Sequence, residues 1–288
     1  QVYIAWSERA HARLARLDVE PCRNAPGVAC ALTAADIPGD NDVSPAHRHD
    51  DPVFAENVEQ YWGQSLFAVA ADTIEQARRA AALAVVEYED LPPLLDIDEA
   101  RARNELVVDG MTLRRGDAAA ALQAAGHRLT GRMRIGGQDH FYLEGQVALA
   151  IPGEDGDVTV LSSTQHPSEV QQMVASVLGR PVNAVTVEVR RMGGGFGGME
   201  TQANLFACVA ALVAVKTGRA AKCRLDRDDD MIMTGKRHDF VVDYEVGFDD
   251  DGRIRAVSMD YAARAGFSAD LSGPVTDRAL FHADNCYW

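Results

Sequence analysis

Cysteine is scarce in this chain and poorly spaced for metal binding. The five cysteines include no C-x-x-C pair, and the eight histidines include no H-x-x-x-H pair. These are the spacings typical of zinc and iron–sulfur ligands. The two closest histidines, His47 and His49, have no nearby cysteine to complete a site. We therefore expect no zinc or iron–sulfur centre built from this chain alone.

Positive charge is also in short supply. Lys and Arg number 28 against 43 Asp and Glu, which gives a formal net charge of -15. Long-range repulsion opposes binding to nucleic-acid backbones and anionic membranes. The sequence has no apolar run of membrane-spanning length and no signal-peptide pattern at its start. We expect a cytoplasmic protein that binds neither nucleic acid nor membrane; a small anionic ligand held locally stays compatible with this charge.

The rest of the composition is that of a soluble globular protein. Hydrophobic residues make up 47% and charged residues 25% of the 288 residues, enough for two domains of ordinary size. The chain starts without an initiator Met and stops on FHADNCYW. From these ends we expect a piece of a longer polypeptide.

The first part of the chain mixes strand and helix signals. Thr73 and Gln76 have the spacing of a capping box, which predicts a helix over the following stretch, residues 74–91. The polar, turn-rich residues 39–52 are expected to form an exposed loop. Apolar, β-branched segments predict strands at residues 1–6, 27–34 and 65–72.

The second half has clearer periodicity. A helix is expected within residues 166–181, with Pro167 in its first turn and with Gly179 and Pro181 past its end, and a buried helix from 201 ending at Gly218. A hairpin is expected to turn at Asp251-Gly252. Strands are expected at residues 157–163, 184–192 and 222–226. The overall class is α+β, with a domain over 1–110, a linker over 111–128 and a second domain over 129–288.

A glycine-rich loop follows one of these strands. Residues 193–198 hold five glycines around Phe196. Between a strand and a helix, the backbone N–H groups of such a loop can point at one concavity, with the positive end of the helix dipole behind them. A phosphate or another oxyanion is the natural guest.

A dinucleotide-binding unit is the first alternative for this loop. Gly193, Gly195 and Gly198 satisfy G-x-G-x-x-G. However, Asp226 lies 28 residues beyond Gly198, whereas the ribose-binding acid is expected about 20 residues on. Glu200 would also place a negative charge against a pyrophosphate. A tight turn between buried elements explains one or two glycines but not five, and Glu200 itself could be a routine partner of the helix dipole.

Five motifs in order resemble one family. They are GGQDHFYLEGQ (136–146), SSTQHPSEVQ (162–171), RRMGGGFGGMET (190–201), CRLDRDDDMIMTGKRHDF (223–240) and DRALFHADNCY (277–287). Together they resemble the molybdenum-binding subunit or domain of the xanthine dehydrogenase and aldehyde oxidoreductase family. Residues 1–110 are similar, more loosely, to the family's N-terminal α/β-hammerhead domain. The resemblance implies a hammerhead followed by the first part of a molybdopterin-binding domain.

The resemblance also implies cofactor contacts. Gln165 corresponds to the glutamine whose amide reaches the oxo ligand of molybdenum, and Phe196 to the phenylalanine whose backbone contacts the metal site. Gly195 and Gly197 would lie against the cofactor. A neutral amide donor suits an oxo group, although Gln165 taken alone could be an ordinary loop residue. Met199 stands where the family usually has lysine.

Two further positions match residues that face a purine substrate. Glu200 corresponds to the family's purine-facing glutamate and Arg278 to its purine-facing arginine. A carboxyl group can bond a ring N–H, and a guanidinium offers a planar fork of donors to a carbonyl oxygen. Without this context, Arg278 could equally form a weak surface ion pair with Asp277 or Asp284.

The implied reaction is oxidation of hypoxanthine and xanthine to urate, with electrons leaving through 2Fe-2S clusters and FAD, in a partner subunit or domain, to NAD. The family's general-base glutamate is expected beyond residue 288, so we expect the isolated chain to be inactive. Dimerisation of such units is also implied. The alternatives are a related molybdenum hydroxylase for aldehydes or other N-heterocycles, and a non-catalytic assembly module without the metal.

Overall fold

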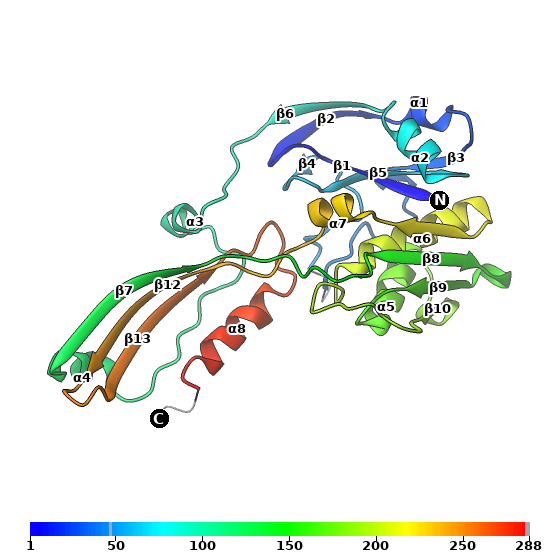
Figure 1. The fold of residues 1–288 in the computed structure, drawn as a ribbon. Helices are drawn as coiled ribbons and strands as arrows, with labels where there is room; N and C mark the ends of the chain where they lie inside the picture. The colour runs from blue at the N-terminus through cyan, green and yellow to red at the C-terminus, as the bar shows by residue number, and fades with distance from the viewer. Residues whose placement is uncertain (46–47, 286–288) are drawn as a thin grey trace. The chain divides into compact units, whose positions relative to one another are not determined.

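The computed structural model describes residues 1–45 and 48–285, and His47 lies outside them. These residues form two compact units, and most contacts of each unit are internal. Unit 1 comprises residues 1–93 and 139–236, and unit 2 comprises residues 94–138 and 237–288. Both units contain helices together with β-sheets (Figure 1), so the predicted α+β class is confirmed. The boundaries proposed at 110 and 128 stay a prediction.

Unit 1 is built on a seven-stranded mixed sheet in the order β10-β9-β8-β11-β1-β5-β3. Three strands come from the start of the chain and four from the later segment, and β1 pairs with β11 in parallel. One sheet therefore contains both parts of unit 1. The strands are β1 (Val2–Trp6), β3 (Val28–Leu32), β5 (Ser65–Ala71), β8 (Val147–Pro152), β9 (Val158–Ser162), β10 (Val185–Glu188) and β11 (Ala221–Arg224).

Two helices pack with this sheet to form the main core. α6 (Ala203–Thr217) is buried over almost its whole length, as its continuous apolar sequence predicts, and it ends at Gly218 with φ 64°. α5 (Pro167–Val177) begins at a proline and buries one apolar face that includes Val170 and Val174. Both helices were expected from the sequence, and both are confirmed. The glycine-rich loop connects β10 to α6.

A second, three-stranded sheet in unit 1 has the order β4-β2-β6. The capping box at Thr73 is present, because the Gln76 N–H donates to Thr73 Oγ1 at 3.2 Å. The helix that it starts ends at Ala81, so the prediction of a helix to residue 91 is wrong after that point. The second half of the stretch is β6. The elements are α1 (Glu20–Arg23), α2 (Ile74–Ala81), β2 (Ala12–Asp18), β4 (Val58–Glu59) and β6 (Val85–Asp90).

The prediction of an exposed loop over residues 39–52 is wrong at residues 42–44. Asp42, Val43 and Ser44 are buried. The Ser44 hydroxyl donates to the Asp42 carboxylate at 2.8 Å, and Val43 N–H donates to the Asp51 carbonyl at 2.8 Å. These internal hydrogen bonds satisfy polar groups that the sequence alone suggested would need water.

Unit 2 is a three-stranded antiparallel sheet in the order β13-β12-β7. The predicted hairpin turn at Asp251-Gly252 is confirmed between β12 and β13, with Gly252 at φ 78°. Gly131 lies opposite Tyr244, and a Cβ there would come within 2.4 Å of the Tyr244 hydroxyl oxygen. The elements are α3 (Ile97–Arg103), α4 (Ala118–Ala124), α8 (Ser272–His282), β7 (His127–Ile135), β12 (Phe240–Phe248) and β13 (Ile254–Ala263).

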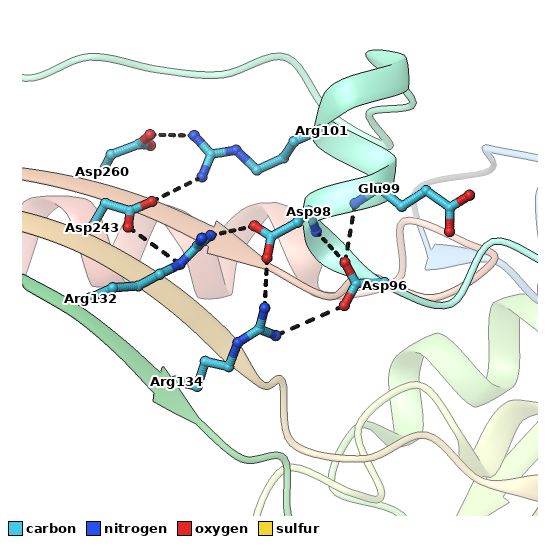
Figure 2. A network of polar contacts seen from close by, with 8 residues as sticks. All are labelled: Asp96, Asp98, Glu99, Arg101, Arg132, Arg134, Asp243 and Asp260. Atoms are coloured by element: carbon cyan, nitrogen blue, oxygen red, sulfur yellow. Dashed lines mark hydrogen bonds and ion pairs between the residues drawn. The ribbon is translucent and has the colours of Figure 1, made fainter.

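Charged side chains attach α3 to this sheet (Figure 2). Asp98 accepts from Arg134 at 2.6 Å and also pairs with Arg132, both on β7. Arg101 pairs with Asp260 on β13 and lies 3.6 Å from Asp243 on β12. These pairs are exposed, so each contributes little alone, but together they connect the short helix to all three strands.

α7 (Arg227–Met233) completes unit 1 and connects its parts. Trp6 Nε1 donates to Asp229 at 3.2 Å, and Arg78 donates to the same carboxylate at 2.6 Å. The neighbouring Asp230 faces the glycine-loop side of the unit, as described below. Among the helices of the described residues, none has the length and hydropathy needed to cross a membrane.

Candidate functional site

The glycines of the loop make room for side chains of the same chain. A Cβ on Gly193 would lie 2.6 Å from Glu144 Cβ, and one on Gly195 would lie 2.5 Å from Gln165 Oε1. A Cβ on Gly198 would lie 2.6 Å from the His140 ring. The close approach that excludes side chains at these positions is therefore made, at least in part, by the protein's own flanking segments.

At the centre of the loop, glycine is required by the backbone conformation and not by a close neighbour. Gly197 has φ 87° with no heavy atom within 4 Å of an added Cβ, so its requirement is conformational. Phe196 is itself in the left-handed region at φ 53° and is 72% exposed. A bulky residue rarely adopts this conformation unless its surroundings hold it there. The loop is thus a specifically shaped turn with its phenylalanine on the surface.

Gln165 holds the C-terminal half of the loop. Its Oε1 accepts from Gly197 N–H at 2.9 Å and from Met199 N–H at 3.3 Å. Its own backbone N–H donates to the Met199 carbonyl at 2.9 Å. Because backbone N–H groups can only donate, they fix the orientation of the amide and leave Nε2 on the other side. Nε2 has no partner among the described residues, and Gln165 is exposed.

Met199 is a buried anchor of the loop. Its side chain is 0% exposed, and Ser163 Oγ lies 3.3 Å from its sulfur. Its carbonyl also accepts from Thr164 Oγ1 at 3.2 Å. The residue that differs from the family's usual lysine therefore belongs to the packing between the loop and the end of β9.

A buried polar group lies beneath the loop, and sequence reasoning missed it. The Tyr142 hydroxyl donates to Asp230 at 2.6 Å, and Gln146 N–H donates to the same carboxylate at 2.9 Å. Gln146 Nε2 in turn donates to the Gly198 carbonyl at 3.0 Å. Burial, followed by the hydrogen bond to Asp230, raises the pKa of Tyr142. The motif FYLEGQ was visible in sequence, and Gln146 Nε2 donates directly to the Tyr142 hydroxyl at 3.1 Å, but the carboxylate that both residues share comes from α7, far along the chain.

Glu200 lies beside the loop and outside the helix. α6 starts at Ala203 and has no acidic residue in its first turn, so Glu200 is not the helix-dipole partner that the sequence allowed. Its side chain is half-buried and has no hydrogen bond or ion pair within the described part of the chain. The carboxylate is thus available to an external donor.

Arg278 lies in unit 2, on α8, and is exposed. The surface ion pair that was its alternative is absent among residues 1–45 and 48–285, where Asp284 pairs with Arg115 at 2.8 Å. Glu200 belongs to the other unit, so the joint use of Glu200 and Arg278 stays a prediction.

The dinucleotide alternative is not supported by the position of Asp226. This residue caps the N-terminus of α7, accepting from Asp229 N–H at 2.9 Å. It also pairs with Arg78 at 2.5 Å. The carboxylate that would bind a ribose is therefore already used within the protein. The described residues contain no cluster of three or more His, Cys, Asp or Glu side chains able to hold a metal ion.

Two family models match nearly the whole chain. One is the a/b hammerhead domain of aldehyde oxidase and xanthine dehydrogenase, over residues 2–92. The other is the molybdopterin cofactor-binding domain, over residues 98–288. The chain is 43% identical to xanthine dehydrogenase/oxidase of Gallus gallus over 285 residues, which are 99% of this chain and 21% of that protein. It is 41% identical to xanthine dehydrogenase of Dictyostelium discoideum, covering 98% of this chain and 21% of the relative.

Solved structures share the fold. Quinoline 2-oxidoreductase from Pseudomonas putida 86 superposes with a TM-score of 0.76 at 25% identity, over 90% of this chain and 35% of that one. Aldehyde oxidoreductase from Desulfovibrio gigas gives a TM-score of 0.77 at 21% identity, over 90% of this chain and 30% of that one. The chain spans about a fifth of the length of the curated relatives it matches.

Proposed function

Because the chain belongs to the aldehyde oxidase and xanthine dehydrogenase family, with its molybdopterin cofactor-binding domain, we propose that it is part of a molybdenum hydroxylase that oxidises hypoxanthine and xanthine to urate. The relatives named xanthine dehydrogenase at 41 to 43% identity support the purine assignment.

The observation that carries the proposal is the orientation of Gln165. Two backbone N–H groups hold Oε1, at 2.9 and 3.3 Å, so Nε2 is the outward donor beside the loop. A neutral donor held in this way fits an oxo ligand, because it adds a hydrogen bond without a competing charge. The residues present therefore fit a molybdenum cofactor. Gln165, Phe196 and the flanking Gly195 and Gly197 would hold it.

When bound, the molybdenum cofactor would supply the activated oxygen nucleophile and the two-electron acceptor. The chain's own residues would orient the purine. Glu200 would accept from a ring N–H, and its half-buried, unpaired carboxylate suits this role. Arg278 would donate to a carbonyl oxygen and stabilise negative charge that develops there.

Electron removal would need centres that lie in other segments or subunits. We propose 2Fe-2S clusters and FAD in a partner subunit or domain, NAD as the acceptor, and dimerisation of the assembled units. The cytoplasm is the proposed compartment. The chain's share of its relatives, 21%, is consistent with several further segments in such an enzyme.

A related hydroxylase for aldehydes or other N-heterocycles is the second candidate. The match to quinoline 2-oxidoreductase, at 25% identity and a TM-score of 0.76, supports an N-heterocycle as the substrate of this second candidate. A non-catalytic module with the same fold is the third.

Metal and pterin analysis of the purified protein that carries this chain tests the proposal, together with a substrate comparison. We expect about one molybdenum and one pterin per chain, and urate formation from xanthine. Oxidation of quinoline or benzaldehyde but not of xanthine would support the second candidate, and absence of both molybdenum and pterin would support the third.

A further inference from the structure

The segment His140–Gln146 lies along the glycine loop. Its even-numbered side chains face the loop, and Phe141 and Leu143 face solvent. His140, Tyr142 and Gln146 contact Gly198 through van der Waals packing or hydrogen bonds, and Glu144 reaches Gly193. The odd-numbered side chains between them are on the surface, with Phe141 62% and Leu143 87% exposed. The even-numbered side chains thus form a support for the loop.

Glu144 contributes a carboxylate to this support. Its Oε2 accepts from Gly193 N–H at 2.6 Å, a length typical of charge-assisted hydrogen bonds. No cation among the described residues pairs with Glu144. A Cβ on Gly193 would lie 3.1 Å from Oε2 and 2.6 Å from Glu144 Cβ, so glycine at 193 lets the carboxylate reach the backbone.

The loop is therefore held at both ends by side-chain oxygens. Glu144 binds the N–H of Gly193, and Gln165 binds the N–H groups of Gly197 and Met199. Within the described part of the chain, the N–H groups of residues 194–196 between them have no partner. The two held ends limit the conformations that residues 194–196 can adopt. The N–H groups of these three residues stay available as hydrogen-bond donors.

We infer that Glu144 is a positioning residue that fixes the N-terminal half of the glycine loop, in concert with Gln165 at the C-terminal half. Its consequence for the cofactor rests on the proposed function. With Glu144 absent, residues 193–196 sample more conformations, and the loop holds the cofactor less firmly. With glutamine in its place, the acceptor oxygen is retained and most of the effect is reversed.

Hydrogen–deuterium exchange of the loop in the cofactor-carrying protein tests the inference. In Glu144→Ala we expect exchange of the Gly193 N–H, which loses its acceptor, to rise roughly tenfold, while the melting temperature changes by less than about 2 °C. Glu144→Gln should restore slow exchange. Glu154→Ala, which removes an exposed carboxylate elsewhere in unit 1, should leave the loop unchanged.

Molybdenum and pterin content supplies the second readout. We expect Glu144→Ala to lose at least half of its cofactor during purification, and Glu144→Gln to retain it. Unchanged loop exchange in Glu144→Ala would overturn the inference, as would faster exchange throughout unit 1 with a lower melting temperature. If the unaltered protein holds no molybdenum, the proposed function fails, and the exchange measurement alone still decides the role of Glu144.

Discussion

The side-chain oxygen of Gln165 lies 2.9 Å from the backbone nitrogen of Gly197. This hydrogen bond joins the N-terminal side of α5 to the turn that carries Phe196. It also determines which end of the amide faces outward. The role proposed for Gln165 as an outward donor depends on this contact.

Replacing Gln165 with glutamate should separate loop support from donation. The carboxylate still accepts from Gly197 and Met199, but the donor at Nε2 becomes an acceptor oxygen. We expect loop exchange to stay within about twofold of the unaltered protein and kcat for xanthine to fall roughly 100-fold. Gln123→Glu, an exposed position on α4, is the control. An unchanged kcat in Gln165→Glu would remove Gln165 from the site.

The burial of Met199 makes a prediction about the family's usual lysine. The side chain is 0% exposed and packs against Ser163. Met199→Lys would place an ammonium in this buried position, and we expect the free energy of unfolding to fall by about 3 kcal/mol or more. Met199→Leu should cost less than about 1.5 kcal/mol. Equal denaturant midpoints for the two variants would contradict the buried, uncharged environment.

Tyr142→Phe tests the polar group beneath the loop. Loss of the hydroxyl leaves Asp230 and Gln146 each without one hydrogen-bond partner. We expect the free energy of unfolding, from urea titration, to fall by about 1 to 3 kcal/mol. Tyr261→Phe on β13, whose hydroxyl contacts only Met259 among the described residues, should change it by less than about 0.5 kcal/mol. A similar change in both variants would show that the Tyr142 hydroxyl has no special role.

A buried carboxyl group gives a pH prediction. Glu59 on β4 is 0% exposed, and its Oε2 accepts from the Ser7 hydroxyl. Burial raises the pKa of Glu59, opposed by the Ser7 hydrogen bond and the charge of Arg9, while Asp90 raises it further. The folded protein therefore holds the proton to higher pH than the unfolded chain does. Its stability should fall as pH rises from the ordinary value of 4.5 through the raised pKa.

Thermal unfolding across this range, with and without Glu59→Gln, measures the effect. The substitution removes the titrating group, so the fall in melting temperature with rising pH should become shallower. Glu188→Gln, at an exposed position on β10, should keep the original slope. A Glu59→Gln profile parallel to that of the unaltered protein would contradict a raised pKa at this position.

The sequence predicted correctly those elements that are specified by a few neighbouring residues. The apolar run of α6, the capping box at Thr73 and the turn at Gly252 each specify their structure within a few residues. The stretch from 74 to 91 was mispredicted because alanines continue the helical pattern to Ala82, while pairing with β2 makes Val85–Asp90 a strand. Propensity is overridden there by a partner distant in sequence.

The candidate site was likewise predictable only in part from the sequence. The motif containing Phe196 and Glu200 was visible in the sequence, and so was Gln165. The contacts that support the loop were not, because Tyr142, Asp230 and Gly198 come from three separate segments. Residues 42–44 were expected to be exposed for a similar reason: their hydrogen-bond partners include Asp51, several residues further along the chain.

The kcat/KM for xanthine in the molybdenum-loaded protein, measured with and without Glu200→Ala, tests the central claim most directly. Glu200 has a half-buried carboxylate without a partner among the described residues, so its removal should spare the fold. We predict urate formation by the unaltered protein and a loss of roughly 100-fold or more in Glu200→Ala. Xanthine oxidation at the same kcat/KM in both proteins, or none in the unaltered one, would contradict the account.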